Sequence, residues 1–326
     1  MTTEEQKADA EFYDDILCDT NIRIIKKLAS GGMGDVFLGE WQGAVGFRKV
    51  VAVKTIRQEL LKNKKTKELF IGEAKLVSDL IHENIIQIYQ LGKRDAGYYI
   101  VMEALFGLDL RGFIKTHVKQ NFAFPVELGA FVISRVCRAL HYAHHKTNHE
   151  GRALGIVHRD VTPNNVMINY GGVVKLMDFG IAKALSFEVI DERRSLMGKF
   201  PYMSPEQARR EGTDGRSDIY ALGLVAYELL TGKMWYRVKD VDSLLAKMND
   251  DPIPPIRKFN PEIPDVLNDI IMKSVQLAPD ARFSTAREMG QALEHYMYGK
   301  GYGPTNEKLA AYIAEVDPRA KQLGNI

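Results

Sequence analysis

Cysteine is scarce in this sequence, whose 326 residues include only Cys18 and Cys137. Neither cysteine belongs to a Cys-x-x-Cys pair or to a spacing typical of metal ligands. We therefore expect no disulfide framework and a reducing compartment.

Long apolar runs are missing as well. No window approaches the roughly 20 consecutive apolar residues that a membrane-spanning helix needs. Residues 1–10 are polar and lack the apolar core of a signal peptide. These absences predict a soluble, cytoplasmic protein with no membrane span.

Neither sign of charge is in excess, because 44 Lys and Arg residues against 42 Asp and Glu residues give a formal net charge of +2. This balance gives no electrostatic argument for nucleic acid or a membrane surface as the main partner. The basic run at residues 62–67 has no aromatic companions for nucleic-acid binding. His141 and His145 are spaced as one helix face, but no thiolate or carboxylate accompanies them at a zinc-like spacing. We expect neither nucleic acid nor zinc as a ligand.

The hydrophobic pattern changes character about a third of the way along the chain. Strand-like segments occupy residues 22–28, 35–38, 49–56, 85–91 and 98–102, and one segment with helical spacing covers 68–80. From Gly107 on, helical patterns dominate, at 125–145, 217–230, 264–275 and 285–297. This order predicts an α+β fold with a small β-rich lobe, a larger helical lobe and a crevice at the join near residues 104–107. The predicted organisation is a polar tail at 1–20, the two lobes at 21–104 and 105–298, and an extension at 299–326 with one short helix at 306–316.

Two segments of the β-rich part suit the binding of phosphate. In Ala29-Ser-Gly-Gly-Met-Gly34, glycines at 31, 32 and 34 let backbone amides approach phosphate oxygens, although for the segment alone a tight hairpin turn is the better explanation. Lys54 ends the apolar run Val51-Ala-Val-Lys54, where its charge needs the strand edge or anionic partners. ATP phosphates and Glu73 are candidate partners, and a surface lysine is the alternative.

Two segments of the helical part carry acidic and amide side chains in loops. In His158-Arg-Asp160-Val-Thr-Pro-Asn-Asn165, the aspartate suits a base for an acceptor hydroxyl and Asn165 suits a magnesium ligand. Asp178-Phe-Gly180 follows, with an aspartate that would hold Mg²⁺ over the phosphates.

These four segments resemble, in order and spacing, the signature of protein kinases. Tyr202-Met-Ser-Pro-Glu206-Gln, Asp218-Ile-Tyr-Ala-Leu-Gly223 and Arg282 continue the resemblance, which covers residues 22–297. The segments at 178–183 and 204–207 are similar to eukaryotic-like bacterial serine/threonine kinases, and the insertion at 148–155 is similar to soluble myxobacterial kinases. The resemblance implies a bilobal kinase fold and transfer of the ATP γ-phosphoryl group, with Mg²⁺, to serine or threonine hydroxyls of protein substrates. It also implies self-association for autophosphorylation.

The resemblance also implies individual roles. Asp160 would be the catalytic base, with Lys54 on the phosphates and Asn165 and Asp178 as metal ligands. Further nucleotide contacts would come from Leu28, Ala29, Gly31, Gly32, Gly34, Val36, Ala52, Glu73, Met102, Glu103, Leu105, Asp109 and Met167.

The sequence departs from the family at two positions beside the catalytic aspartate. Thr162 stands where a lysine is usual, and Lys199 stands where a threonine is usual. We hypothesise an exchange, in which Lys199 supplies the cation at the γ-phosphoryl group and Thr162 supplies the anchoring hydroxyl. A solvated loop lysine with slow turnover is the alternative.

The resemblance implies that Arg159, directly before the catalytic aspartate, goes with control by a phosphate on the segment that follows Asp178. Ser195 is the candidate phosphosite and Ser186 is a second one. The acidic residues at 188, 191 and 192 are alternative partners for the arginine.

Two other functions compete with a serine/threonine kinase. Ala29 and Thr162 would suit a pseudokinase that binds ATP as a scaffold, but the four catalytic and metal-binding candidates are all present. A small-molecule phosphotransferase is disfavoured by the Pro-Glu segment and Arg282, which shape a polypeptide-docking surface in the family.

Overall fold

The computed structural model describes residues 21–31, 34–56, 64–94, 97–120, 123–179, 200–317 and 319–320. Two compact units make up this structure. The first contains the described residues up to Ile81 together with Ile86–Leu105, and the second contains His82–Ile85 and the described residues from Phe106 on. Among the described residues, no helix is long and apolar enough to cross a membrane.

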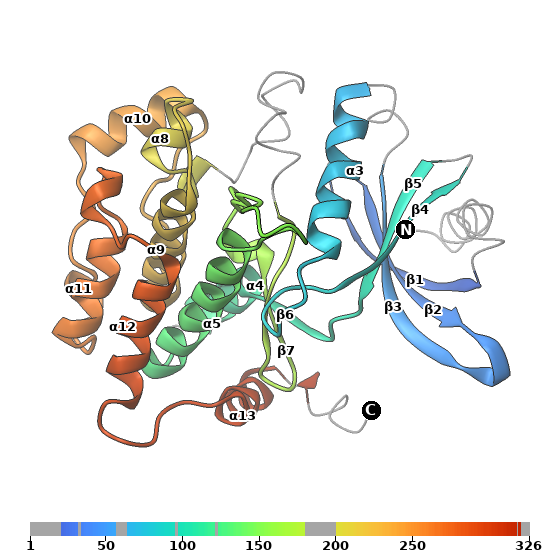
Figure 1. The fold of residues 1–326 in the computed structure, drawn as a ribbon. Helices are drawn as coiled ribbons and strands as arrows, with labels where there is room; N and C mark the ends of the chain where they lie inside the picture. The colour runs from blue at the N-terminus through green and yellow to red at the C-terminus, as the bar shows by residue number, and fades with distance from the viewer. Residues whose placement is uncertain are drawn as a thin grey trace. The chain divides into compact units, whose positions relative to one another are not determined.

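The first unit is built on a five-stranded antiparallel sheet with the order β1-β2-β3-β5-β4 (Figure 1). Its strands are β1 (Ile22–Ser30), β2 (Asp35–Gln42), β3 (Arg48–Thr55), β4 (Ile88–Arg94) and β5 (Gly97–Glu103), and a 3₁₀ turn, η1 (Ala44–Gly46), precedes β3. Helix α3 (Lys64–Ser78) is the single helix among the described residues of this unit. The segment predicted as a strand from residue 85 joins the sheet only at Ile88.

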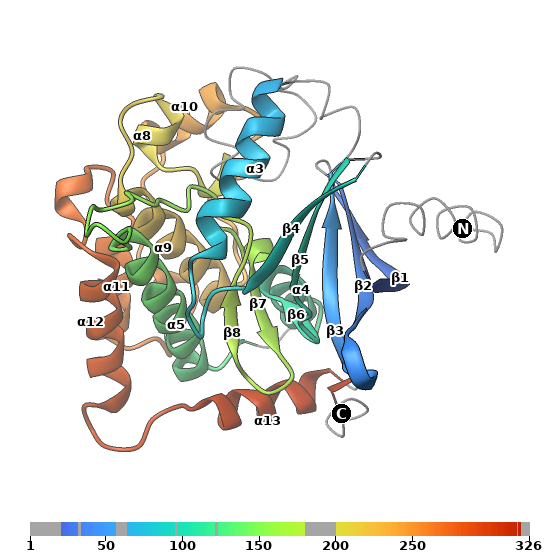
Figure 2. The same ribbon diagram turned by 45° about the vertical axis from the view of Figure 1, so that its right-hand side comes forward.

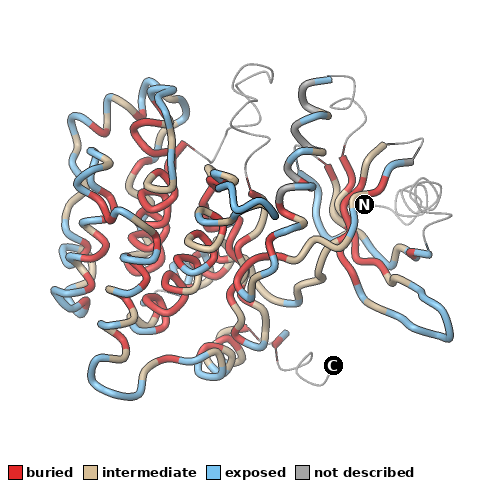
Figure 3. The backbone as a smooth tube through the Cα atoms, viewed as in Figure 1, coloured by how far each residue is buried: buried red, intermediate tan, exposed pale blue. Residues whose placement is uncertain are grey.

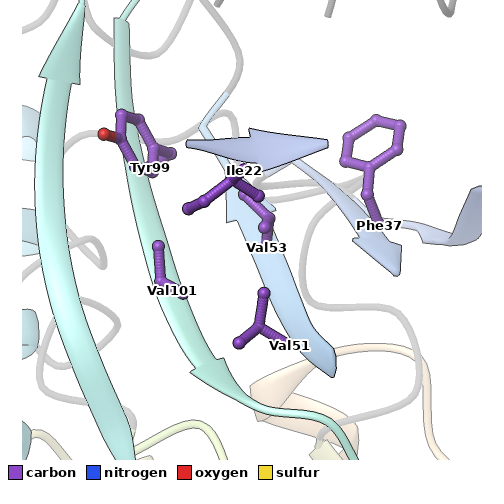
Figure 4. Close-up of a cluster of buried hydrophobic side chains, with 6 residues drawn as sticks. All are labelled: Ile22, Phe37, Val51, Val53, Tyr99 and Val101. Carbon is purple, nitrogen blue, oxygen red and sulfur yellow. The ribbon is translucent and has the colours of Figure 1, made fainter. Parts of the chain in front are cut away.

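Side chains alternate between the two faces of this sheet, because successive residues of a strand point in opposite directions. One face carries a buried cluster of Ile22, Phe37, Val51, Val53, Tyr99 and Val101 (Figure 4). On the opposite face, Ile100 packs with Ile56 and with Ala74 of α3, so the helix covers part of that face.

The second unit is mainly helical and contains the long helices α5 and α9. Its helices are α4 (Leu110–Gln120), α5 (Val126–His144), α8 (Pro205–Ala208), α9 (Gly215–Thr231), α10 (Val241–Asp250), α11 (Asp265–Ser274), α12 (Ala286–Tyr298) and α13 (Asn306–Val316). Short 3₁₀ turns are η2 (Pro163–Asn165), η3 (Phe200–Tyr202), η4 (Ile256–Lys258) and η5 (Pro279–Ala281). A small antiparallel sheet orders its strands β6 (Gly107–Asp109), β7 (Val166–Asn169) and β8 (Val174–Leu176).

Helix α9 forms the centre of the second unit. Its residues from Ser217 to Leu230 are all buried, and the tube in Figure 3 is red along this helix. Asp214 caps its first turn, and Gly232 ends it in the left-handed conformation that glycine tolerates (φ 69°). The α+β fold with a β-rich first part and a helical second part is confirmed.

The extension after α12 docks onto the same unit through α13, which has the predicted bounds. Leu309 and Ile313 of α13 are fully buried. Tyr312 Oη lies 2.6 Å from His117 Nε2 of α4. Figure 2 shows α13 running beneath the turn between β7 and β8, and a Cβ on Gly172 of that turn would lie 1.9 Å from the carbonyl oxygen of Asn306. The close approach of two backbones explains the glycine.

Candidate active site

One face of the sheet in the first unit carries four of the predicted nucleotide-binding residues. Val36 pairs with Lys54 across β2 and β3, and Ala52 pairs with Met102 across β3 and β5. Directly paired residues point to the same side of a sheet, and so do residues two apart on one strand. All four side chains therefore share one face, where Ala52 is buried and the other three are half-buried.

The glycine segment between β1 and β2 forms a hairpin turn. Ala29 pairs with Val36, and the amide of Gly31 donates to the carbonyl oxygen of Gly34 at 2.8 Å. A Cβ on Gly34 would lie 1.7 Å from the Thr55 carbonyl oxygen, so packing against β3 already requires this glycine. Leu28 is 48% exposed, and Gly32 lies outside the described residues.

The end of β5 is tied to the residue that precedes β4. The Glu103 amide donates to the Gln87 carbonyl oxygen at 2.9 Å, and the Gln87 amide donates to Glu103 Oε2 at 3.3 Å. The backbone leading to Leu105 is thereby fixed. Glu73 lies in α3, but its side chain is outside the described part, so its pairing with Lys54 stays a prediction.

In the second unit, the predicted catalytic loop brings Asp160 and Asn165 into direct contact. Asn165 Nδ2 donates to Asp160 Oδ2 and to the Asp160 carbonyl oxygen, both at 2.7 Å. Both residues are buried, with 7% and 8% of their surface exposed. Thr162 is also buried and immediately precedes η2, where its carbonyl oxygen accepts from the Asn165 amide at 3.0 Å.

Asp178 is joined to this loop through its neighbours. The Met177 amide donates to the Asn165 carbonyl oxygen at 2.8 Å. His158 Nε2 lies 2.9 Å from the Met177 carbonyl oxygen, and the His158 ring lies 4.5 Å from the ring of Phe179. Asp178 has a φ of 49°, in the left-handed region that residues other than glycine adopt uncommonly, although aspartate does so more often than most. Backbone strain of this kind concentrates at functional sites.

Asp218, at the start of α9, holds the first half of the loop. Its carboxylate accepts from the amides of His158 and Arg159 at 2.8 and 2.7 Å, and it lies 2.8 Å from His144 Nε2 of α5. Arg159 has a φ of 62°, and the two bonds to a buried carboxylate compensate for this strained backbone.

Asp109 and Met167 are neighbours across β6 and β7. Asp109 Oδ1 also accepts from the Gly112 amide at 2.7 Å. This carboxylate therefore holds the first turn of α4, a role that the sequence did not indicate.

Glu206 and Arg282 form the ion pair that the family resemblance implied. Two bonds join the guanidinium to the carboxylate, at 2.7 and 2.9 Å, and Ser217 Oγ donates to Glu206 Oε1 at 2.6 Å. Burial alone would raise the pKa of the Glu206 carboxyl, but the bonds from Arg282 and Ser217 outweigh it and lower that pKa to about 2.

Sequence reasoning missed two residues that position this loop. Asn84 donates to the Val174 carbonyl oxygen at 2.9 Å and accepts from the Leu176 amide at 2.8 Å, so it fixes the strand leading to Asp178. His144 was one of several histidines near the end of a predicted helix, and only its contact with Asp218 sets it apart. Lys199, Ser186 and Ser195 lie outside the described residues.

Comparison with known proteins supports the protein kinase family that the sequence motifs indicated. The protein kinase domain family matches residues 22–297. The tyrosine-protein kinase MasK of Myxococcus xanthus is 37% identical over 297 residues, which are 90% of this chain and 46% of MasK. The serine/threonine-protein kinase PrkC of Bacillus subtilis is 34% identical over 267 residues, which are 82% of this chain and 39% of PrkC.

The chain thus spans less than half the length of these two relatives. The solved kinase domain of PknI from Mycobacterium tuberculosis superposes with a TM-score of 0.63 at 25% identity, covering 84% of this chain and 95% of that domain. The predicted family and fold are confirmed, and the chain belongs to the protein kinase family.

Proposed function

We propose that the protein transfers the γ-phosphoryl group of ATP to serine or threonine hydroxyls of proteins. The observation that carries this proposal is the buried contact between Asp160 and Asn165, beside the strained backbone of Asp178. Asp160 would accept the proton of the substrate hydroxyl as that oxygen attacks phosphorus. Its bond from Asn165 holds the carboxylate in one orientation for that task.

The donor atoms of this loop suit a magnesium ion. Both bonds of the Asn165 side chain to Asp160 use the amide nitrogen, which leaves the amide oxygen as the atom offered to a metal. Asp178 would add carboxylate oxygen, and Mg²⁺ prefers such oxygen ligands. When bound, the ion neutralises charge on the phosphates.

The sheet of the first unit would hold the rest of the nucleotide. Its face with Val36, Ala52 and Met102 is largely apolar, which suits an adenine ring, and it carries Lys54 for the phosphates. Met167 and Asp109 of the second unit would contact adenine and ribose. Glu73, Glu103, Leu105, Leu28 and the glycine turn complete the proposed nucleotide contacts.

The decisive experiment follows label from γ-³²P-ATP into a generic protein substrate and into the chain itself. We expect Asp160→Asn to reduce the turnover number by about a thousandfold, because proton acceptance and positioning are lost together. Asp265→Asn, at an exposed carboxylate, is the charge-matched control and should keep normal turnover. Labelling by Asp160→Asn at the wild-type rate would refute the proposal. Tight ATP binding without any labelling by the wild type would favour the pseudokinase.

The acceptor hydroxyl needs its own measurement. Pro163 follows the serine/threonine form of the loop, whereas MasK is named a tyrosine kinase. Hydrolysis of the labelled protein and separation of its phosphoamino acids distinguishes the two. Phosphoserine and phosphothreonine are expected, and phosphotyrosine alone would indicate a tyrosine kinase.

We propose that Lys199 and Thr162 have exchanged roles, as the sequence suggests. Lys199→Ala should then lower the turnover number by about a hundredfold or more, since one preorganised charge contributes several kcal/mol to the transition state. The double exchange Thr162→Lys/Lys199→Thr should recover most of the loss. Near-normal turnover of Lys199→Ala would exclude the exchange.

We also propose that copies of the chain phosphorylate one another in the cytoplasm, with Ser195 and then Ser186 as acceptors. Within the described structure, the buried Nε atom of Arg159 has no hydrogen-bond partner, which suits a phosphate acceptor. Wild-type enzyme should label Asp160→Asn protein in trans. Mass spectrometry that finds Ser195 unmodified in fully active enzyme would remove this site.

A further inference from the structure

A cavity of about 640 Å³ lies in the second unit between α5 and α12, with His82 among its lining residues. Its volume is within the range of small-molecule sites. None of the residues assigned above to ATP, magnesium or catalysis lines it. The cavity is therefore separate from the candidate active site.

Basic side chains dominate its lining. One carboxylate, Glu294, faces six groups that are cationic or can become so: Arg138, Lys146, Arg287, His82, His141 and His145. Glu294 is already engaged, because it lies 2.7 Å from the Arg138 guanidinium. Lys146 contacts the neutral hydroxyl of Tyr142 at 3.1 Å. In the described part of the chain, neither Lys146 nor Arg287 has a carboxylate within ion-pair distance.

Burial and neighbouring cationic groups both act on the histidines of this cavity. His141 Nδ1 is buried and has no hydrogen-bond partner within the described structure, and its ring lies 4.2 Å from the ring of His145. Burial lowers the pKa of His141, and His145, Arg287 and His144 lower it further. Burial also lowers the pKa of His82, where Glu83 opposes the shift and Arg138 and Lys175 add to it. Burial disfavours charge of either sign, but the contribution of the neighbouring cationic groups is one that a bound anion would relieve.

A metal ion fits this lining poorly. The described residues contain no group of three or more His, Cys, Asp or Glu side chains that could hold one. Cys137 at the cavity is buried, and burial raises the pKa of its thiol, so it stays protonated. The guanidinium and ammonium groups that line the cavity bind phosphate oxygens with charge-assisted hydrogen bonds, and an imidazole does so once it is protonated.

We propose that this cavity binds a small molecule carrying phosphate groups, with Lys146 and Arg287 as the main charged contacts and His141 as a further donor. Inorganic pyrophosphate is the probe, because it carries several phosphate oxygens in a volume that the cavity can hold. Magnesium is left out, so that binding at the candidate active site is disfavoured. Titration is followed by calorimetry and by NMR of the His141 imidazole, which is assigned with His141→Gln.

We expect pyrophosphate to bind and to raise the pKa of His141, because a nearby anion stabilises the imidazolium. Lys146→Gln/Arg287→Gln should weaken binding by about tenfold or more. Lys247→Gln/Arg257→Gln, which removes the same charge from elsewhere in this unit, should change the affinity by no more than about twofold. Thermal unfolding of both double variants checks that they fold.

Three results would overturn the proposal. The first is a His141 resonance that pyrophosphate shifts no more than sodium chloride of equal ionic strength does. The second is equal weakening of binding in both double variants, which would indicate only the general charge of the protein. The third is undiminished binding to Gln291→Glu, which places a new carboxylate on the cavity wall.

Discussion

Replacing Arg282 by methionine removes one partner of a buried ion pair and leaves the other in place. The Arg282 side chain is fully buried and that of Glu206 is 7% exposed. The guanidinium also donates to the carbonyl oxygens of Gln276, Leu277 and Arg216 at 2.7 to 2.9 Å. After the substitution, Glu206 keeps the bond from Ser217 but loses both bonds to the guanidinium.

The expected cost follows from this burial. Removing one member of a buried pair costs about 3–5 kcal/mol, because the other charge stays in a poorly solvated place without its partner. Glu206→Gln should cost less, because the amide is neutral and its oxygen still accepts hydrogen bonds. In the double variant no charge is left unpaired, so its cost should fall short of the sum of the two single costs.

Urea unfolding at pH 7 measures these free energies. The control is Arg257→Met, because the pair of Arg257 and Asp265 is 44% and 77% exposed and should contribute less than about 1 kcal/mol. A loss below about 1 kcal/mol for Arg282→Met would refute the reasoning, since it would place Arg282 among the surface pairs. Costs that add without coupling would refute the pairing itself.

The same pair predicts a pH dependence with a definite sign. The pKa of the Glu206 carboxyl is about 2 in the folded protein, whereas its ordinary value, taken here for the unfolded chain, is 4.5. A carboxyl with a lowered folded-state pKa stabilises the fold above its unfolded pKa, and this contribution disappears as the pH falls toward the folded value. About 3 kcal/mol is therefore present at neutral pH, and about 2 kcal/mol of it should be lost by pH 3. The stability difference between wild type and Glu206→Gln should shrink over that interval, and a constant difference would contradict the lowered pKa.

Three further substitutions test contacts that position the site. Gly172→Ala combines a φ of 77° with a Cβ placed 1.9 Å from the backbone of α13, so it should release that helix and speed limited proteolysis near residue 300. Asp218→Asn replaces one acceptor of the catalytic-loop amides by a donor, and we expect the turnover number to fall about tenfold or more while circular dichroism stays unchanged. Gly223→Ala would bring a Cβ to 2.1 Å from Ser274 Oγ and should cost about 1–3 kcal/mol in urea unfolding, part of which Ser274→Gly should restore.

Regular periodicity made much of the fold predictable. The segments at 217–230, 264–275, 285–297 and 306–316 became α9, α11, α12 and α13 with bounds that differ by at most two residues. The small sheet of β6, β7 and β8 was not predicted. Strands of three or four residues carry too little pattern, and the pairing of β6 with β7 joins segments about 60 residues apart.

The candidate site likewise contains contacts that were predictable from the sequence and contacts that were not. Asp160 and Asn165 are five residues apart, so one loop brings them together and their spacing alone was informative. The contacts of Asn84 with β8 and of His144 with Asp218 span 90 and 74 residues. No local pattern marks such residues, because what they bind is decided by packing of the whole unit.

The docking of α13 links the extension to the proposed nucleotide site. The family match ends at residue 297, yet Tyr312 of α13 packs on α4 and Tyr170 Oη donates to Asp317 at 3.3 Å. The Tyr170 amide in turn donates to the carbonyl oxygen of Phe106, one residue before β6. The extension therefore contacts the last turn of α4 at His117 and, through Tyr170, the residue before β6, the strand that ends at Asp109. Helix α13, which lies beyond the family match, thus supports the two elements that meet at Asp109, the residue proposed to contact the ribose.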